Sequence, residues 1–141
     1  MQGNAIIETE EKMTNKLELY KCNICNNMVE IVLNGYGKLV CCDQEMELLI
    51  PNTHDGAIEK HVPVVEDIEG GKVIKVGSTP HPMEPEHYIQ FIEVISSDEK
   101  YVKREYLYPG EEPKMKLKCD CAGKDIFARE NCNIHGLWSN K

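Results

Sequence analysis

Long apolar runs and an excess of basic residues are both missing from this 141-residue chain. No stretch approaches the roughly 20 apolar residues that a membrane-spanning helix needs. Lysine and arginine number 16 against 24 acidic residues, a formal net charge of −8, which argues against partners such as nucleic acid or anionic membranes, because both require a basic face. Residues 1–16 (MQGNAIIETEEKMTNK) lack the basic start and apolar centre of a secretion signal. We therefore expect a flexible N-terminal extension there and a cytoplasmic protein.

Seven cysteines are present. Their odd number disfavours a framework made only of disulfides, and in the reducing cytoplasm thiols persist as metal ligands or catalysts. The cysteines therefore predict metal chemistry.

Residues 17–52 have the pattern of a small β domain. Short apolar pieces at 29–33, 38–40 and 47–50 are separated by Asn34-Gly35 and Gly37, which are hairpin and turn signals. So few residues cannot bury much apolar surface, so that a domain of this size needs a covalent or metal staple.

Four cysteines in this region are spaced to supply the staple. Cys22-Asn-Ile-Cys25 is followed by Cys41-Cys42. Successive side chains of an extended strand face opposite ways, so Cys41 and Cys42 can share an ion only if the chain bends there; the expected site is a distorted tetrahedron. Free or disulfide-bonded cysteines are the alternative. The spacing does not separate zinc from iron, although only iron could carry an electron.

Residues 53–141 are predicted to form a second all-β domain. Strands are expected at 62–68 and 72–76 around a Glu-Gly-Gly turn, at 88–95 with both faces buried, and at 101–108. Apolar and charged residues then alternate from Lys114 to Cys121, as in a strand with one buried face. Strands this short and frequent favour a small β-sandwich.

Histidines and one C-x-x-H motif in this domain suggest a second metal centre. His81 and His87 flank two prolines and so lie on a loop, not on one helical face. Cys132 and His135 are spaced to reach one ion, and His61 precedes a strand. Any one of these histidines is more often an ordinary loop or core residue. Together they predict a non-haem metal centre. His54 precedes a predicted turn and is left out of it.

The strings YKCNICNNMVEIV, LVCCDQEME, EKHVPV, HPMEPEHYIQFIE and CNIHGLW resemble the desulfoferrodoxin family, in the same order and from about Leu17 onward. The resemblance implies an all-β fold, with a small metal-stapled desulforedoxin-like domain followed by an immunoglobulin-like β-sandwich. It also implies two non-haem iron ions per chain. The ligands of an Fe(Cys)₄ centre would be Cys22, Cys25, Cys41 and Cys42. A mononuclear iron would be held by four equatorial imidazoles, His61, His81, His87 and His135, and by an axial thiolate, Cys132.

The same resemblance implies a superoxide reductase, which reduces superoxide to hydrogen peroxide by one electron at the Fe(His)₄(Cys) centre while the Fe(Cys)₄ centre transfers electrons. Lys60 resembles the lysine that attracts superoxide, and Glu59 the carboxylate that occupies the sixth position of the resting iron. A rubredoxin-like electron donor and a homodimer are implied as partners. The chain departs from the family in its 16-residue extension, in Phe91 where relatives often carry tryptophan, and in two extra cysteines, Cys119 and Cys121. We interpret these two as inward-facing residues.

Two other functions compete with this interpretation. A zinc-stapled binding module would account for the four N-terminal cysteines but would leave the histidines unexplained. The other is a one-electron carrier without a substrate of its own. The metal content and the yield of peroxide from superoxide distinguish the three.

Overall fold

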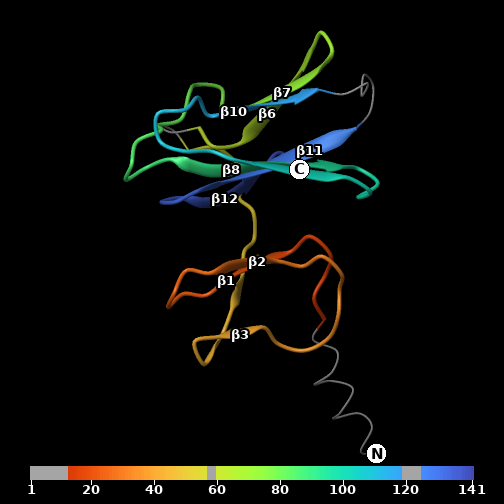
Figure 1. Ribbon diagram of the computed structural model, residues 1–141, viewed down its shortest axis with the longest axis vertical. Helices are drawn as coiled ribbons and strands as arrows, with labels where there is room; N and C mark the ends of the chain where they lie inside the picture. The colour runs from red at the N-terminus through yellow and green to blue at the C-terminus, as the bar shows by residue number, and fades with distance from the viewer. Residues whose placement is uncertain (1–12, 57–59, 119–124) are drawn as a thin grey trace, which may run out of the picture. The chain divides into compact units, whose positions relative to one another are not determined.

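The computed structural model describes residues 13–56, 60–118 and 125–141. These residues form twelve β-strands (Figure 1). None of them belongs to a helix that could cross a membrane. The chain divides into two compact units, of which the first ends at Ile50 and the second begins at Pro51.

The first unit consists of a three-stranded antiparallel sheet and a separate hairpin. The sheet has the order β2-β1-β5, with β1 at Leu19–Lys21, β2 at Met28–Glu30 and β5 at Glu47–Leu48. The hairpin joins β3, Val40–Cys41, to β4, Gln44–Glu45. The three apolar pieces predicted as strands overlap β2, β3 and β5. Strands β1 and β4 were not predicted.

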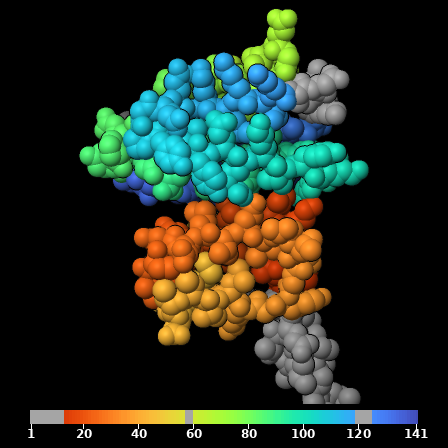
Figure 2. All heavy atoms as spheres, viewed as in Figure 1, coloured from red at the N-terminus to blue at the C-terminus, as the bar shows by residue number. Residues whose placement is uncertain are grey.

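Little of the first unit is buried. Among its described hydrophobic residues only Leu17, Leu19, Cys22 and Met46 are buried, whereas Leu33 is 81% exposed. Figure 2 shows this unit in red to yellow with all its heavy atoms. A body with so few buried side chains depends on a staple, as the sequence indicated.

Residues 13–16 belong to the predicted N-terminal extension. Met13 nevertheless pairs with Tyr36, and the buried Thr14 exchanges hydrogen bonds with Gly35. Residues 1–12 lie outside the described part of the chain.

The second unit is a β-sandwich of two antiparallel sheets. The three-stranded sheet has the order β10-β7-β6 and the four-stranded sheet the order β12-β11-β8-β9. Their bounds are β6 Pro63–Ile68, β7 Gly71–Val76, β8 Ile89–Ser96, β9 Val102–Tyr106, β10 Lys114–Lys118, β11 Ile126–Cys132 and β12 Gly136–Ser139. The core includes Ile74, Met115, Ile92, Ala128 and Cys132.

Strand β8 is buried on both faces, as predicted. Ile92 faces the core, and the fully buried Glu93 accepts hydrogen bonds from the guanidinium groups of Arg104 and Arg129. The pairing of β8 with β11 is irregular between Asn131 and Cys132. A β-bulge of this kind re-aims side chains, and it occurs at a residue predicted to be a metal ligand.

Most strands of the second unit were predicted from the sequence, but its last two were not. The all-β fold with a β-sandwich is confirmed, and β6, β7, β8, β9 and β10 lie where strands were expected. Strands β11 and β12 were not predicted. Cys119 and Cys121 lie outside the described residues.

Candidate metal centres

The turn after β1 forms the first half of a sulfur cluster. Cys22 donates its backbone N–H to Asn27 and accepts one at its carbonyl from Asn26, which adopts a left-handed φ of 66°. Within this turn the N–H groups of Ile24 and Cys25 point at Cys22 Sγ, at 3.4 and 3.5 Å. Such N–H groups stabilise a thiolate and leave its outer side open to a cation.

The hairpin of β3 and β4 provides the expected bend. Cys41 pairs with Gln44, so Cys42 and Asp43 are the two turn residues, and their φ angles are 53° and 58°. Two left-handed residues in a two-residue loop are typical of a type I′ turn, whose twist matches that of the flanking strands. The turn places the side chains of Cys41 and Cys42 on the same side of the chain, which an extended strand would not allow.

The four sulfur atoms lie close enough to share one ion. All are within 4.8 Å of one another. Cys25 Sγ is 3.6 Å from Cys41 Sγ, and Cys41 Sγ is 4.0 Å from Cys42 Sγ. Four sulfurs at about 2.3 Å from a central ion in tetrahedral geometry would be roughly 3.8 Å apart. The residues therefore fit a tetrathiolate metal site, and none of the four is in a disulfide.

The thiols of this cluster differ in acidity. Hydrogen bonds from the backbone N–H groups of Cys25 and Ile24 lower the pKa of Cys22 to about 6. Hydrogen bonds to Cys25, then to Cys22 and Cys41, raise the pKa of Cys42 to about 12. The pKa of Cys41 is also raised, chiefly by its hydrogen bond with Cys25, so Cys22 loses its proton more readily than Cys41 and Cys42. A bound cation would displace these protons.

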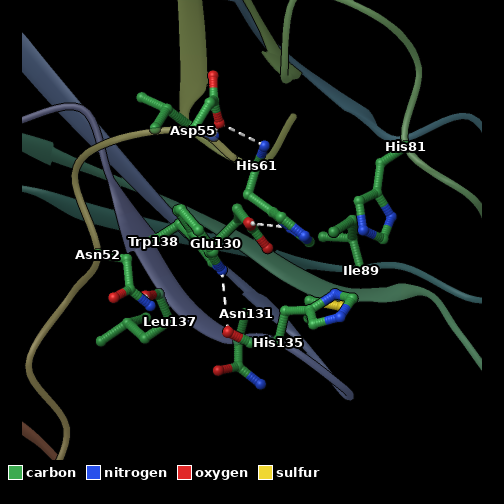
Figure 3. Close-up of polar contacts among 12 residues, drawn as sticks. Asn52, Asp55, His61, His81, Ile89, Glu130, Asn131, His135, Leu137 and Trp138 are labelled. Carbon is green, nitrogen blue, oxygen red and sulfur yellow. Dashed lines mark hydrogen bonds and ion pairs between the residues drawn. The ribbon is translucent and has the colours of Figure 1, made fainter. Parts of the chain in front are cut away.

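The second group of donors lies at one end of the β-sandwich. His61 lies two residues before β6, and His81 lies in the connection between β7 and β8. Cys132 ends β11 and pairs with Gly136, so that His135 is in the loop of the β11–β12 hairpin. The donor atoms of these four residues all lie within 4.8 Å of one another, and Figure 3 shows the imidazoles of His61, His81 and His135 turned toward a common space.

His87 completes a ring of four imidazoles. The ring centroids of His61 and His81 are 4.5 Å apart, those of His81 and His87 4.8 Å, and those of His87 and His135 5.1 Å. The cycle closes with 5.1 Å between His135 and His61. His87 does not, however, belong to the group whose donor atoms are within 4.8 Å. Its ring has the right neighbours, but its nitrogen is less closely placed than the others.

Two of the imidazoles have an oxygen atom close to Nδ1. The Nδ1 atom of His81 lies 2.7 Å from the carbonyl oxygen of Pro82, and since a carbonyl only accepts, Nδ1 carries the proton. The Nδ1 atom of His61 lies 3.5 Å from the carboxylate of Glu130, both residues being buried (Figure 3). In each ring the Nε2 atom remains as the metal donor. A carboxylate or carbonyl behind a ligating histidine is the usual way to fix its tautomer.

This donor set fits one ion. Nitrogens at about 2.1 Å from a metal are roughly 4.2 Å apart when they lie on opposite sides, which is within the observed 4.8 Å limit. Cys132 is fully buried, whereas His135 is exposed. A site with a buried thiolate and an exposed rim has a protected side and a side open to a small molecule.

Comparisons with known proteins agree with both halves of the chain. The family model described as desulfoferrodoxin matches residues 53–141, and the one described as the desulfoferrodoxin N-terminal domain matches residues 14–49. A desulfoferrodoxin of Desulfarculus baarsii is 48% identical over 126 residues, which cover 89% of this chain and 97% of that protein. The chain belongs to the desulfoferrodoxin family.

Two further relatives of this desulfoferrodoxin chain extend the comparison. A desulfoferrodoxin homolog of Archaeoglobus fulgidus is 50% identical, over 91% of this chain and 99% of that protein. The crystal structure of the superoxide reductase from Treponema pallidum superposes with a TM-score of 0.69 and 26% identity, and the match covers 91% of this chain and all of that one.

The structure describes some, but not all, of the other residues considered for the site. Lys60 is half-buried, and its Nζ donates to the carbonyl of Gly56 at 2.9 Å. Glu59 lies outside the described residues. His54 is exposed, lies 3.1 Å from the hydroxyl of Thr53 and is absent from the donor group.

The sequence did not predict the residues that surround the histidines. Asp55 Oδ1 accepts the backbone N–H groups of His61 and Val62 at 2.7 and 2.8 Å, which fixes the segment carrying Lys60 (Figure 3). The same segment lies against Gly77, where a Cβ atom would be 2.4 Å from the carbonyl oxygen of Lys60. A larger residue at position 77 would therefore displace it.

Trp138 contacts two of the ligand segments. Its ring stacks on His61 with 4.5 Å between centroids and 14° between planes, and its Nε1 donates to the carbonyl of His135 at 3.1 Å. Backbone hydrogen bonds from Asn52 to Leu137 and from Ser139 to Asn52 brace β12 on both sides of Trp138. The signal in the sequence was slight: Trp138 is the single tryptophan of the chain, three residues after His135.

Proposed function

We propose that this chain is a superoxide reductase with two non-haem iron ions. The observation that carries the proposal is the convergence of His61, His81, Cys132 and His135 on one space, with the ring of His87 beside it. Neither a zinc-stapled binding module nor a simple electron carrier requires such a donor set with an exposed side. The reaction combines superoxide with one electron and two protons to give hydrogen peroxide.

The ligands proposed for the catalytic iron are His61, His81, His87, His135 and Cys132. These residues would hold an iron ion, which would supply one-electron redox chemistry at this site. The Cys132 thiolate would raise the electron density at the metal, as thiolate ligands do. Glu130 would hold the proton on Nδ1 of His61, so that the imidazole keeps its orientation.

Lys60 is proposed to attract the substrate. The protein carries a net charge of −8, so its overall field repels an anion and capture depends on a local positive charge. The ammonium group sits on the segment that also carries His61, and this segment is fixed by Asp55. Glu59 is proposed, from the resemblance, as the carboxylate that occupies the open position in the resting state.

The four-cysteine site is proposed to hold the second iron, which would transfer electrons. The geometry of its sulfurs supports one ion in tetrahedral coordination. The resemblance supports a rubredoxin-like donor and a homodimer. Thiols that act as metal ligands support a cytoplasmic location, where they are not oxidised to disulfides. The domain limits proposed are those of the sequence, 17–52 and 53–141.

The test is to purify the protein anaerobically, count its metals and expose it to superoxide. We expect two irons per chain and peroxide without evolution of oxygen. Stoichiometric zinc in protein from iron-replete cells would favour the binding module. Oxygen released together with peroxide would mean dismutation instead of reduction.

A further inference from the structure

The hairpin loop between β11 and β12 contacts the loop that carries His87. Asn133 follows Cys132, and its side-chain Nδ2 donates to the carbonyl of Glu86 at 2.9 Å. Its Oδ1 accepts the backbone N–H of Tyr88, also at 2.9 Å. The backbone N–H of Asn133 donates to the carbonyl of Tyr88 at 3.2 Å. One residue is thus bonded to the backbone on both sides of His87.

The loop around His87 also has other hydrogen bonds, among them one from the backbone N–H of Gly110 to the carbonyl of Met83 at 2.9 Å. Glu84 and His87 exchange two backbone hydrogen bonds of 3.0 Å, which close the loop on itself. Pro82 and Pro85 in the same loop carry no N–H group with which to bond to a neighbouring strand. The bonds from Asn133 join this loop to the strand pair that carries Cys132 and His135.

The position of His87 relative to the other proposed ligands shows why a bond to its loop matters. His87 is the one predicted imidazole ligand outside the group of donors within 4.8 Å of one another. Its ring is nevertheless close to those of His81 and His135. His87 can therefore bind the ion shared by the others only while its loop holds the imidazole in place beside them.

We propose that Asn133 is a positioning residue that fixes His87 with respect to Cys132 and His135, and so determines whether the last imidazole binds the metal. The proposal rests on the ligand set given under the proposed function. A carboxamide suits this role because it donates and accepts at once. Alanine offers neither function and aspartate only accepts. Asn133 acts mainly through the backbone beside His87, and its Oδ1 also lies 4.0 Å from Cys132 Sγ.

The experiment measures how tightly the full-length, two-iron protein holds its iron. Wild type and variants are challenged anaerobically with increasing amounts of a ferrous chelator, and the released iron is counted. The visible absorption of the tetrathiolate centre shows whether that centre stays filled. Asn140→Ala is the matched control, because Asn140 Oδ1 also accepts a backbone N–H, that of Ala128 at 2.9 Å, but contacts no segment on either side of His87.

For Asn133→Ala we expect the centre to bind iron about 10- to 100-fold more weakly, the usual effect of losing a group that orients a metal ligand. Asn133→Asp, which keeps the acceptor for Tyr88, should lie between this variant and wild type. His87→Ala should weaken binding on its own. In the His87→Ala background Asn133→Ala should weaken binding much less than it does alone, because most of its effect passes through His87.

Three results would overturn the proposal. The first is iron release from Asn133→Ala at the same chelator concentration as from Asn140→Ala. The second is a full additional loss in the double variant, which would show that Asn133 acts independently of His87. The third is unchanged binding in His87→Ala, which would refute the ligand set itself and is therefore distinguishable from the first two. The circular dichroism and melting temperature of each variant separate loss of the ligand from loss of the fold.

Discussion

Removal of the Trp138 side chain should weaken the catalytic metal site by a predictable amount. The indole stacks on His61 and donates a hydrogen bond to the carbonyl of His135, so it holds two proposed ligand segments in place. A stacked aromatic pair contributes about 0.5–1.5 kcal/mol, and a neutral hydrogen bond contributes about the same. Trp138→Ala forfeits both, about 1–3 kcal/mol together. At about 1.4 kcal/mol per factor of ten, its iron affinity should fall by about 5- to 140-fold.

Trp138→Phe separates the two contributions. Phenylalanine can stack on His61 but has no N–H group to donate, so only the hydrogen bond is lost. Its iron affinity should fall by about 2- to 12-fold. Anaerobic competition with a ferrous chelator measures both variants, and Tyr101→Ala, which removes a 74% exposed aromatic residue, is the control. Equal affinities for wild type, Trp138→Phe and Trp138→Ala would refute the role of the indole, as would an equal loss in the control.

Three further variants test the proposed roles. Cys22→Ser should abolish the visible absorption of the tetrathiolate centre while superoxide reduction continues, because the other ligands all follow Pro51; simultaneous loss of both would show that the units depend on each other. Lys60→Ala should slow the capture of superoxide by about ten-fold and reduce its salt dependence, since charge steering is screened over about 10 Å at 0.1 M salt; pulse radiolysis beside the control Lys103→Ala would measure this, and equal salt slopes for Lys60→Ala and wild type would contradict it. Cys132→Ser should remove the thiolate-to-iron absorption and most activity, whereas Cys119→Ser should cost only about 1 kcal/mol of stability; loss of the absorption in Cys119→Ser instead would make the proposed ligand wrong.

The strands that were predictable from the sequence are those whose burial follows a simple pattern. Lys114–Lys118 alternates between lysine and apolar residues, and Ile89–Ser96 carries apolar residues at both odd and even positions, as a strand buried on both faces does. Strand β11 was missed because it contains three consecutive polar residues of the kinds that usually lie at a surface, Arg129, Glu130 and Asn131. In the folded protein they are buried, since their partners come from distant segments, such as Glu93 for Arg129. No local pattern reveals such pairs.

The candidate sites were predictable to a different degree. The spacing of the four cysteines and the required bend at Cys41-Cys42 followed from the chain alone, because the site is built from two short turns. The histidine site draws on separated segments, so that spacing indicated a metal centre and the family resemblance supplied its ligand set. Glu130, Trp138 and Asn133 were not found, because their roles depend on the register of β11 and β12.

Cys132 belongs both to the proposed iron site and to the hydrophobic core. It is a proposed iron ligand, and it is also a fully buried member of the sandwich core, clustered with Ile89, Ile92 and Ala128. Interiors are packed so closely that the loss of even one methylene group is felt by the neighbours. Changes in the packing of the hydrophobic interior would therefore change the iron–sulfur bond. The visible absorption of the protein would change with them. A substitution among the core residues packed with Cys132 would then also alter the position of the proposed thiolate ligand.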